Sequence, residues 1–337
     1  MQQDKMVEKN KNYFKQFLKT VVPLSFGLLV FWLTFKQLDI NNIQSILKED
    51  VNYWIIALSL PFGLFGNIIR AYRWDLLIRA LGHRPKKSNL IYSFLGNYAV
   101  NLAIPRFGEV WRCTMISRYE RIPLTALLGT MITDRLFDFV PVGLIIVVAF
   151  ILNVPYFSKF YAQNSGMLDY FYEISTSVWL YVGIAIIAII VWFFFTFFKE
   201  KAFMRKTKLT LMNIWEGIKS IIVMKDKWMF IFYTFLIWFG YFLYFYICFY
   251  AFPFTKDLGL NCGLIAFGIS SIAVSIPVQA GIGPWHIAVI AVLTSFGVSS
   301  DAAGAFAFGV HTIQAIIFTA ITGIIGIIAL PIVNKGK

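Results

Sequence analysis

Charged side chains are scarce in this sequence. Asp, Glu, Lys and Arg make up only 14% of the 337 residues, whereas soluble domains carry about 25% of them. Apolar residues make up 59% of the chain, and the mean hydropathy is +0.71. This composition excludes an ordinary soluble domain and predicts an all-α polytopic membrane protein.

Metal-binding cysteine patterns and nucleotide-binding motifs are also missing. Cys113, Cys248 and Cys262 have no metal-ligand spacing, so we expect them to be packing residues and expect no metal or other cofactor. The sequence has no Walker motif, so the chain itself is not expected to use ATP. No small-residue cleavage site follows the first apolar run, Val21 to Phe35, which we therefore interpret as an anchor.

Lysines and arginines are present in clusters, and their positions predict the topology. If six helices cross the membrane, 25 of the 30 basic residues lie on one side, four lie on the other, and Arg135 lies within a span. Positive residues mark the cytoplasmic side, so both termini are predicted to be cytoplasmic. The net charge of +13 then requires no nucleic acid partner. The predicted spans are 20–36, 51–69, 124–152, 175–198, 228–252 and 302–331.

Two further apolar stretches do not fit as simple spans. Residues 89–104 have basic clusters on both flanks and are short for a crossing, so we predict a re-entrant helix on the cytoplasmic side. Residues 260–296 start and end on the outer side and are broken, so we predict a second re-entrant hairpin from the opposite face. Such a pair is typical of an inverted repeat. The residues that break the second stretch are Pro277, Gly281, Gly283 and Pro284.

The domain organisation follows from these spans. We expect one transmembrane domain over residues 20–331, between a basic N-terminus at 1–19 and a cytoplasmic tail at 332–337. Its two halves would cover about 20–152 and 175–331.

Two basic stretches between the spans, residues 70–81 and 205–224, combine positive side chains with an apolar face. Both suit helices that lie in the headgroup region of an anionic leaflet. They equally suit plain positive-inside anchors, and the sequence leaves this choice open.

The most informative segment runs from Asn97 to Arg112, where charges directly follow a short apolar stretch. Charge at membrane depth is costly and usually meets a polar cargo or a partner charge. Pro105 and Gly108 bracket Arg106 and would break a helix there. The combination indicates broken-helix backbone that lines a cavity, as in transporters.

Three motifs, in this order, carry a resemblance to a known family. They are Arg70-x-x-Arg73-Trp74, Asn101-x-x-x-Pro105-Arg106-x-Gly108-Glu109-x-x-Arg112 and Asp134-Arg135-x-x-Asp138. With them the chain resembles, from about residue 20 to 331, the lysylphosphatidylglycerol synthase transmembrane (flippase-like) family. The resemblance implies a protein of the bacterial or archaeal inner membrane that moves lipids or lipid-linked molecules between leaflets.

Two features differ from other members of that family. The chain stops at Lys337 without the aminoacyltransferase domain of the bifunctional members, so no lipid aminoacylation is expected. Family members tend to carry a glutamate after the glycine-rich break of the second half, where this sequence has His286. The exchange favours a different headgroup or a pH-sensitive site.

Arg106 and Arg112 are the leading candidates for binding an anionic headgroup, because a guanidinium binds phosphate bidentately. Glu109 would pair with either arginine or bind the ammonium group of a lipid. The alternative is a charged network that caps the broken helix and has no part in transport.

Further charged and polar residues support this predicted site. Asp134 and Asp138 share one helix face, and Arg135 can pair with Asp138, either as an internal salt bridge or as part of a cargo site. We expect Arg70 and Arg73 to belong to the same charge network. Polar residues predicted to line the cavity or to satisfy freed backbone groups are Asn97 and Asn101 in the first half, with Gln279, Gly281, Gly283, His286, His311 and Gln314 in the second.

The leading functional hypothesis is a lipid translocase in which the headgroup passes Arg106, Glu109 and Arg112 while the tail stays in the bilayer. The first alternative is a membrane enzyme that acts on a polyprenyl-phosphate-linked or phospholipid substrate, although no catalytic motif is recognisable. The second is an accessory subunit that hands lipid to a separately encoded lipid-modifying enzyme. All three make a membrane lipid the partner.

Overall fold

The computed structural model describes residues 21, 24–36, 38–152, 177–178, 181–182, 224–276 and 278–335. The chain divides into two compact units, the first made of residues 1–149 and 224–337 and the second of residues 150–223. All elements below belong to the first unit, apart from the last three residues of helix α6. The predicted span 175–198 and the amphipathic stretch 205–224 fall almost entirely outside the described residues.

Within the described residues, four long apolar helices have the length and composition of membrane spans, since about 20 apolar residues cross a bilayer. The described part of the predicted first span is a shorter apolar helix, Leu24–Phe35. Together these helices confirm an all-α polytopic membrane fold. The long helices are α3 (Tyr53–Ala80), α6 (Leu124–Leu152), α11 (Lys227–Tyr246) with η1 (Ile247–Ala251), and a continuous run of α14 (Ser300–His311), η3 (Thr312–Phe318) and α15 (Thr319–Ile332).

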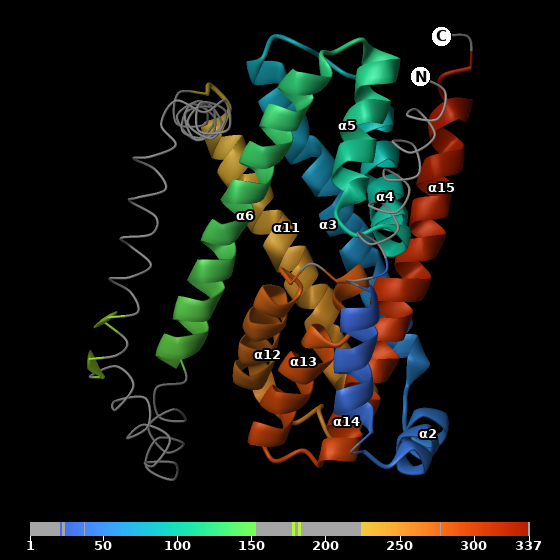
Figure 1. Ribbon diagram of the computed structural model, residues 1–337, viewed down its shortest axis with the longest axis vertical. Coiled ribbons are helices and arrows are strands. Elements are labelled where there is room, and N and C mark those ends of the chain that lie inside the picture. Colours follow the sequence, from blue (N-terminus) through green and yellow to red (C-terminus); the bar gives the residue numbers. More distant parts are fainter. Residues whose placement is uncertain are drawn as a thin grey trace, which may run out of the picture. The chain divides into compact units, whose positions relative to one another are not determined.

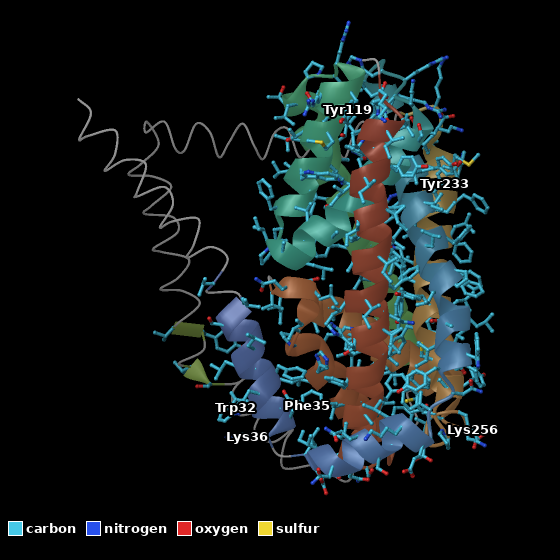
Figure 2. The ribbon with its side chains drawn as sticks, turned by 90° about the vertical axis from the view of Figure 1, so that its right-hand side faces the viewer. Trp32, Phe35, Lys36, Tyr119, Tyr233 and Lys256 are labelled. Carbon is cyan, nitrogen blue, oxygen red and sulfur yellow. The ribbon has the colours of Figure 1, made fainter. Side chains whose placement is uncertain are left out.

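The bundle has two ends, and aromatic residues lie toward both. We call the end where α3 finishes and α15 finishes the basic end, and the end that carries the surface helix α2 (Ile40–Glu49) the opposite end (Figure 1). Tyr119 and Tyr233 lie toward the basic end, whereas Trp32 and Lys256 lie toward the opposite end (Figure 2). Aromatic side chains at two such levels are typical of the two membrane–water interfaces.

The first re-entrant hairpin consists of α4 (Lys87–Ala103) and α5 (Phe107–Glu120). The chain enters from the basic end, turns at Arg106, whose φ of 61° is left-handed, and returns to the same end (Figure 1). The two helices are very close at Gly108, where an added Cβ would lie 2.1 Å from the backbone oxygen of Asn97. The predicted re-entrant segment is confirmed as a helical hairpin.

The second hairpin consists of α12 (Gly259–Ala273) and α13 (Pro284–Ser295), with the short 3₁₀ turn η2 (Gln279–Gly281) between them. It starts and ends at the opposite end (Figure 1). Its break is a run of left-handed backbone, with φ of 52° at Ala280, 75° at Gly281 and 90° at Gly283, and glycine adopts such angles without a steric penalty.

The tips of the two hairpins meet in the middle of the bundle. Arg106 Nη2 donates a hydrogen bond of 2.6 Å to the backbone oxygen of Ser275, and α4 also packs against η2. Figure 1 shows α4 and α5 on one side of this meeting point and α12 and α13 on the other. The hairpins therefore enter from opposite ends, as the distribution of basic residues predicts.

For residues 70–81 the sequence left two interpretations open, and the separate headgroup helix is the one that is wrong. Helix α3 continues without a break to Ala80. Arg70 is 5% exposed and Arg73 is fully buried. Their charges are compensated inside the bundle by carboxylates of α6, so the polar face of this segment points inward.

Small residues hold the first hairpin against the C-terminal helix. An added Cβ at Gly323 of α15 would lie 2.3 Å from the Cβ of Ala99, and one at Gly326 would lie 2.6 Å from the backbone oxygen of Tyr92. Such close backbone approach is a common way of packing helices in lipid. It places α4 firmly beside a membrane span.

Candidate functional site

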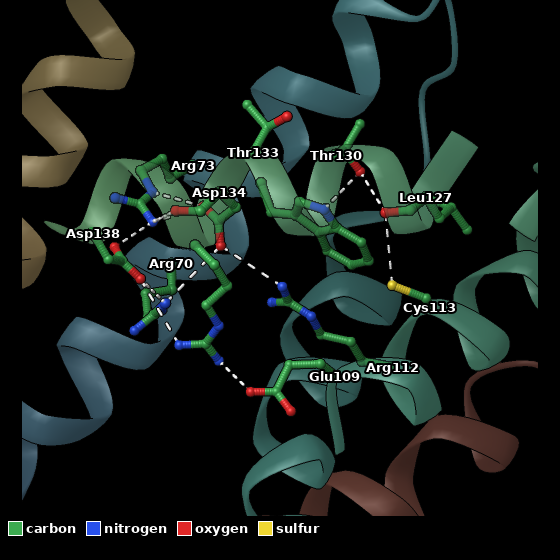
Figure 3. Close-up of polar contacts among 12 residues, drawn as sticks. Arg70, Arg73, Glu109, Arg112, Cys113, Leu127, Thr130, Thr133, Asp134 and Asp138 are labelled. Atoms are coloured by element: carbon green, nitrogen blue, oxygen red, sulfur yellow. Dashed lines mark hydrogen bonds and ion pairs between the residues drawn. The ribbon is translucent and has the colours of Figure 1, made fainter. Parts of the chain in front are cut away.

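The centre of the candidate site joins two arginines of α3 to two aspartates of α6 (Figure 3). Arg73 Nη2 lies 2.7 Å from Asp134 Oδ1 and 2.6 Å from Asp138 Oδ1, and Arg70 is hydrogen-bonded to Asp138. Residues three or four apart share a helix face, so the spacing within each motif brings both of its charges to the shared interface. The charge network expected from the sequence is thus present.

This network extends to the first hairpin. Arg112 Nη2 of α5 lies 3.7 Å from Asp134 Oδ2, and Arg135 Nη2 of α6 lies 2.9 Å from Glu109 Oε1. Arg135 also lies 3.8 Å from Asp138, as the sequence suggested. Four arginines and three carboxylates are thereby connected, so the network carries one net positive charge. Its members are Arg70, Arg73, Glu109, Arg112, Asp134, Arg135 and Asp138.

Most of the network lies inside the bundle, with Arg135, whose side chain is 30% exposed, at its edge. Arg73, Arg112 and Asp134 are all 0% exposed. Burying a charge is costly unless a partner compensates it, and here six of the seven charges can be matched as three pairs. One arginine remains in excess.

Arg112 is the arginine with the poorest polar compensation. None of its three guanidinium nitrogens forms a hydrogen bond within the described part of the chain. Its Cζ lies over the rings of Trp74, at 4.5 Å from the centroid, and Phe94, at 4.0 Å. Cation–π contacts stabilise the charge but leave its N–H groups unused.

The two asparagines of α4 have different surroundings. Asn101 Oδ1 accepts a hydrogen bond of 2.8 Å from the backbone N–H of Gly108, so it satisfies a free donor at the start of α5. Asn97 is fully buried, and neither atom of its amide is hydrogen-bonded to any residue that the structure describes. Asn97 faces the same helix junction as Gly108.

Arg106 lies apart from the network, and the expected pairing of Glu109 is wrong. The left-handed backbone at Arg106 directs its exposed side chain to Ser275 of the second hairpin. Glu109 pairs with Arg135 instead of Arg106 or Arg112, because Arg135 on α6 lies next to the first turn of α5. Arg106, Glu109 and Arg112 therefore do not form one cluster.

The polar residues of the second half form a separate group around its break. His311 Nε2 donates to the backbone oxygen of Ala280 at 2.9 Å, and His286 Nδ1 accepts from the N–H of Gly283 at 3.3 Å. The centroids of the two imidazole rings lie 4.4 Å apart, and the ring planes are tilted by 53°. Gln279 is buried beside Gly281 in η2, and Gln314 donates to Ser59 at 2.8 Å. The two histidines hold the backbone of the break in place, whereas Gln314 is bonded to Ser59 of α3.

The comparison with protein families identifies the architecture. Residues 20–322 match the family model described as "Lysylphosphatidylglycerol synthase TM region". The chain belongs to this family. No curated protein and no solved structure matches it. As a member of the lysylphosphatidylglycerol synthase TM region family, it is a multi-pass membrane protein related to lipid modification or translocation.

Within this family fold, two uncharged residues at the site, Phe94 and Thr130, escaped the sequence analysis, and Trp74 was noted only as part of a motif. Phe94 and Trp74 contact the Arg112 guanidinium, and Trp74 Nε1 donates to Thr130 Oγ1 at 3.0 Å. The spacing of Trp74 from Arg70, one helical turn, was the available signal. Among the residues that the structure describes, no group of three or more His, Cys, Asp or Glu side chains could hold a metal ion.

Proposed function

We propose that this protein moves a lipid or lipid-linked molecule between membrane leaflets, with the polar headgroup passing the contact between the two hairpins. One observation carries the proposal: two broken hairpins from opposite ends touch through Arg106 and Ser275, and the first hairpin also contributes Glu109 and Arg112 to a largely buried network with one excess positive charge. Broken helices that meet inside a bundle are how transporters bring polar groups to a midplane site. The basic end is the cytoplasmic end in this proposal, and both termini are on that side.

Arg106 acts as the closing contact in this mechanism. Its partner is the Ser275 carbonyl, two residues after α12 ends at Ala273, and a helix C-terminus carries partial negative charge. A headgroup phosphate is a stronger acceptor for a guanidinium than a neutral carbonyl. The arriving headgroup therefore displaces Ser275, and the two tips separate as it passes.

The apolar tail stays in the bilayer throughout. Helix α6 offers a lipid-facing surface, with Phe139 64% and Ile151 62% exposed, and the headgroup site lies on its other face through Asp134. The protein itself carries out no covalent step and passes the lipid on to the other leaflet or to a separately encoded lipid-modifying enzyme.

Purified protein reconstituted into vesicles with acyl-chain-labelled phospholipids tests the proposal. We expect leaflet exchange, measured by quenching the outer label, to be faster than in protein-free vesicles and to be slowed by Arg112→Met. Arg118→Met is the matched control, because Arg118 is an exposed arginine on the same helix and outside the network. Exchange at the protein-free rate for every labelled headgroup would contradict the proposal.

A further inference from the structure

Three neighbouring membrane spans depart from regular α-helix where they meet. Helix α3 contains Pro61, and a proline inside a helix removes a backbone donor. Helix α11 passes into the 3₁₀ segment η1, and α14 passes into α15 through the π-helix η3. Both η1 and η3 pack against α3. Short 3₁₀ segments in mid-helix often mark a hinge, and short π segments are frequent at functional sites, so this coincidence requires an explanation.

Gln314 of η3 joins the three irregular segments. Its side chain is buried, and its amide nitrogen donates to Ser59 Oγ of α3 at 2.8 Å and to the backbone oxygen of Tyr244 in α11 at 2.6 Å. The same nitrogen lies 3.0 Å from the sulfur of Cys248 in η1. In return, the Tyr244 hydroxyl donates to the backbone oxygen of Gln314 at 3.0 Å. Ser59 lies two residues before Pro61, so one side chain links all three spans close to their irregular turns.

On one side of η3, the chain is fixed to the second hairpin. His311, the last residue of α14, donates to the backbone oxygen of Ala280 in the break at 2.9 Å. Helix α14 also packs against α13. Helix α14 and the second hairpin therefore form one body, which includes the Ser275 carbonyl at the hairpin tip.

On the other side of η3, the chain is fixed to the first hairpin. Helix α15 lies beside α4 (Figure 1), and an added Cβ at Gly323 would lie 2.3 Å from the Cβ of Ala99. Just beyond α15, Asn334 exchanges two buried hydrogen bonds with Asn89 of α4, of 2.7 and 3.1 Å. Helix α15 and the first hairpin therefore form a second body, which carries Arg106.

We infer that the level of Gln314 is a hinge, on which α14 and the second hairpin swing against α15 and the first hairpin. Hinges are a few residues that absorb a change of backbone angle, and η3 is the segment that joins the two bodies. Gln314 is the positioning residue that holds the hinge closed, because a change of bend at η3 moves its amide away from α3 and α11. The inference deepens the proposed function and rests on it for its purpose, since the swing separates Arg106 from Ser275. In a purely structural alternative, η1 and η3 only satisfy backbone groups and the bodies stay fixed.

Distances between spin labels, measured by double electron–electron resonance in lipid nanodiscs, test whether the bodies move. The labels are attached to introduced cysteines, since the native cysteines are buried in the described structure. One pair, Val110→Cys in α5 and Ile269→Cys in α12, connects the two bodies at exposed positions. We expect this pair to show a longer distance in addition to the one in this structure.

Pairs within each body are the internal control. Val110→Cys with Ile324→Cys of α15 reports on the first body, and Ile269→Cys with Ser300→Cys of α14 reports on the second; all four positions are exposed. These distances should stay constant while the distance between the bodies changes. Equal broadening of all pairs would indicate local unfolding and would overturn the hinge.

Variants distinguish a positioning role of Gln314 from a structural one. Gln314→Met keeps the side-chain length and removes the donor, so the ratio of the longer to the shorter distance should rise roughly fivefold, the factor that one ordinary hydrogen bond supplies. Tyr244→Phe is the milder variant, because it removes only the hydroxyl that bonds to Gln314, and it should act in the same direction. Ser93→Ala removes a buried hydroxyl whose bond stays within α4, and this matched control should leave the ratio unchanged.

The hinge and the proposed function can fail separately, because the distances are measured without transport. An unchanged ratio in both Gln314→Met and Tyr244→Phe would overturn the hinge, whatever their unfolding temperatures, even if wild-type protein exchanges lipid in vesicles. The expected rise in the ratio without any lipid exchange would support the hinge and refute translocation alone.

Discussion

The two hairpins have matching topologies but are held together by different chemistry. In the first, Glu109 and Arg112 of α5 join a buried network of arginines and carboxylates. In the second, the imidazoles of His286 and His311 form hydrogen bonds directly with the backbone of the break. An inverted pair of hairpins can therefore be asymmetric in its chemistry: the first hairpin carries buried charge, and the second provides the Ser275 carbonyl that accepts from Arg106.

Tethering the two tips should have the largest effect on function. Arg106→Cys and Ser275→Cys, joined by a flexible thiol-reactive cross-linker, would keep the hairpins together, and we expect lipid exchange to fall to the protein-free rate. Cleavage of a reducible linker should restore it, as measured in the same vesicles. The native cysteines are buried in the described structure, so the cross-linker should react mainly with the two introduced ones. Each single variant, treated with the same cross-linker, is the control. Undiminished exchange in the linked protein would exclude tip separation as a step.

Breaking the charge network should have the largest effect on stability. Asp134→Leu leaves Arg73 and Arg112 without their shared carboxylate, so we expect a loss of about 3–5 kcal/mol in the free energy of unfolding, as for other buried pairs. Chemical unfolding in detergent measures it. In the double variant with Arg73→Met the loss should be smaller, because one uncompensated charge is gone. A loss in the double variant equal to the sum of the losses in Asp134→Leu and Arg73→Met would show that the two residues are not coupled.

The hairpins themselves were predictable, because the positive residues on both flanks of 89–104 and the glycines of 260–296 are local signals that need no knowledge of packing. The burial of Arg70 and Arg73 was not. An alternation of arginines with apolar residues looks the same in a helix at the membrane surface and in one whose charges point inward. The partners that decide between them, Asp134 and Asp138, are more than 60 residues away along the chain.

The same limit applies to Glu109 and to Arg106. Both were singled out by their position after the break, but Arg135 as the partner of Glu109 depends on how α6 crosses α5. The direction of Arg106 depends on its left-handed backbone, φ of 61°, an angle that an arginine rarely adopts and that its sequence does not announce. Residue type thus indicated which side chains were candidates, and only packing assigned their partners.

Glycine substitutions compare how tightly each hairpin is packed. Gly108→Ala in α5 would place a Cβ 2.1 Å from the backbone oxygen of Asn97, which cannot move aside without shifting α4, so we expect a loss of about 1–3 kcal/mol. Gly268→Ala in α12 would place a Cβ 3.5 Å from Ile145, an ordinary contact, so we expect no loss or a gain of up to about 1 kcal/mol from helix propensity. Thermal unfolding of both variants in detergent measures the difference, and equal effects would show that the first hairpin is no more closely packed than the second.

The smallest expected effect on stability concerns the side chain that accepts a hydrogen bond from a free backbone N–H at each break. Asn101 accepts from Gly108 at 2.8 Å in the first hairpin, and His286 accepts from Gly283 at 3.3 Å in the second. Replacing such an acceptor usually costs about 1 kcal/mol, and the shorter bond should be the stronger. We therefore expect Asn101→Leu to lower the unfolding free energy by about 1 kcal/mol and His286→Leu to lower it by less. The variant His286→Gln should recover the stability lost in His286→Leu, because Gln can accept a hydrogen bond and Leu cannot. A larger loss for His286→Leu than for Asn101→Leu would show that the imidazole stabilises the break mainly through its packing against His311 and Phe31.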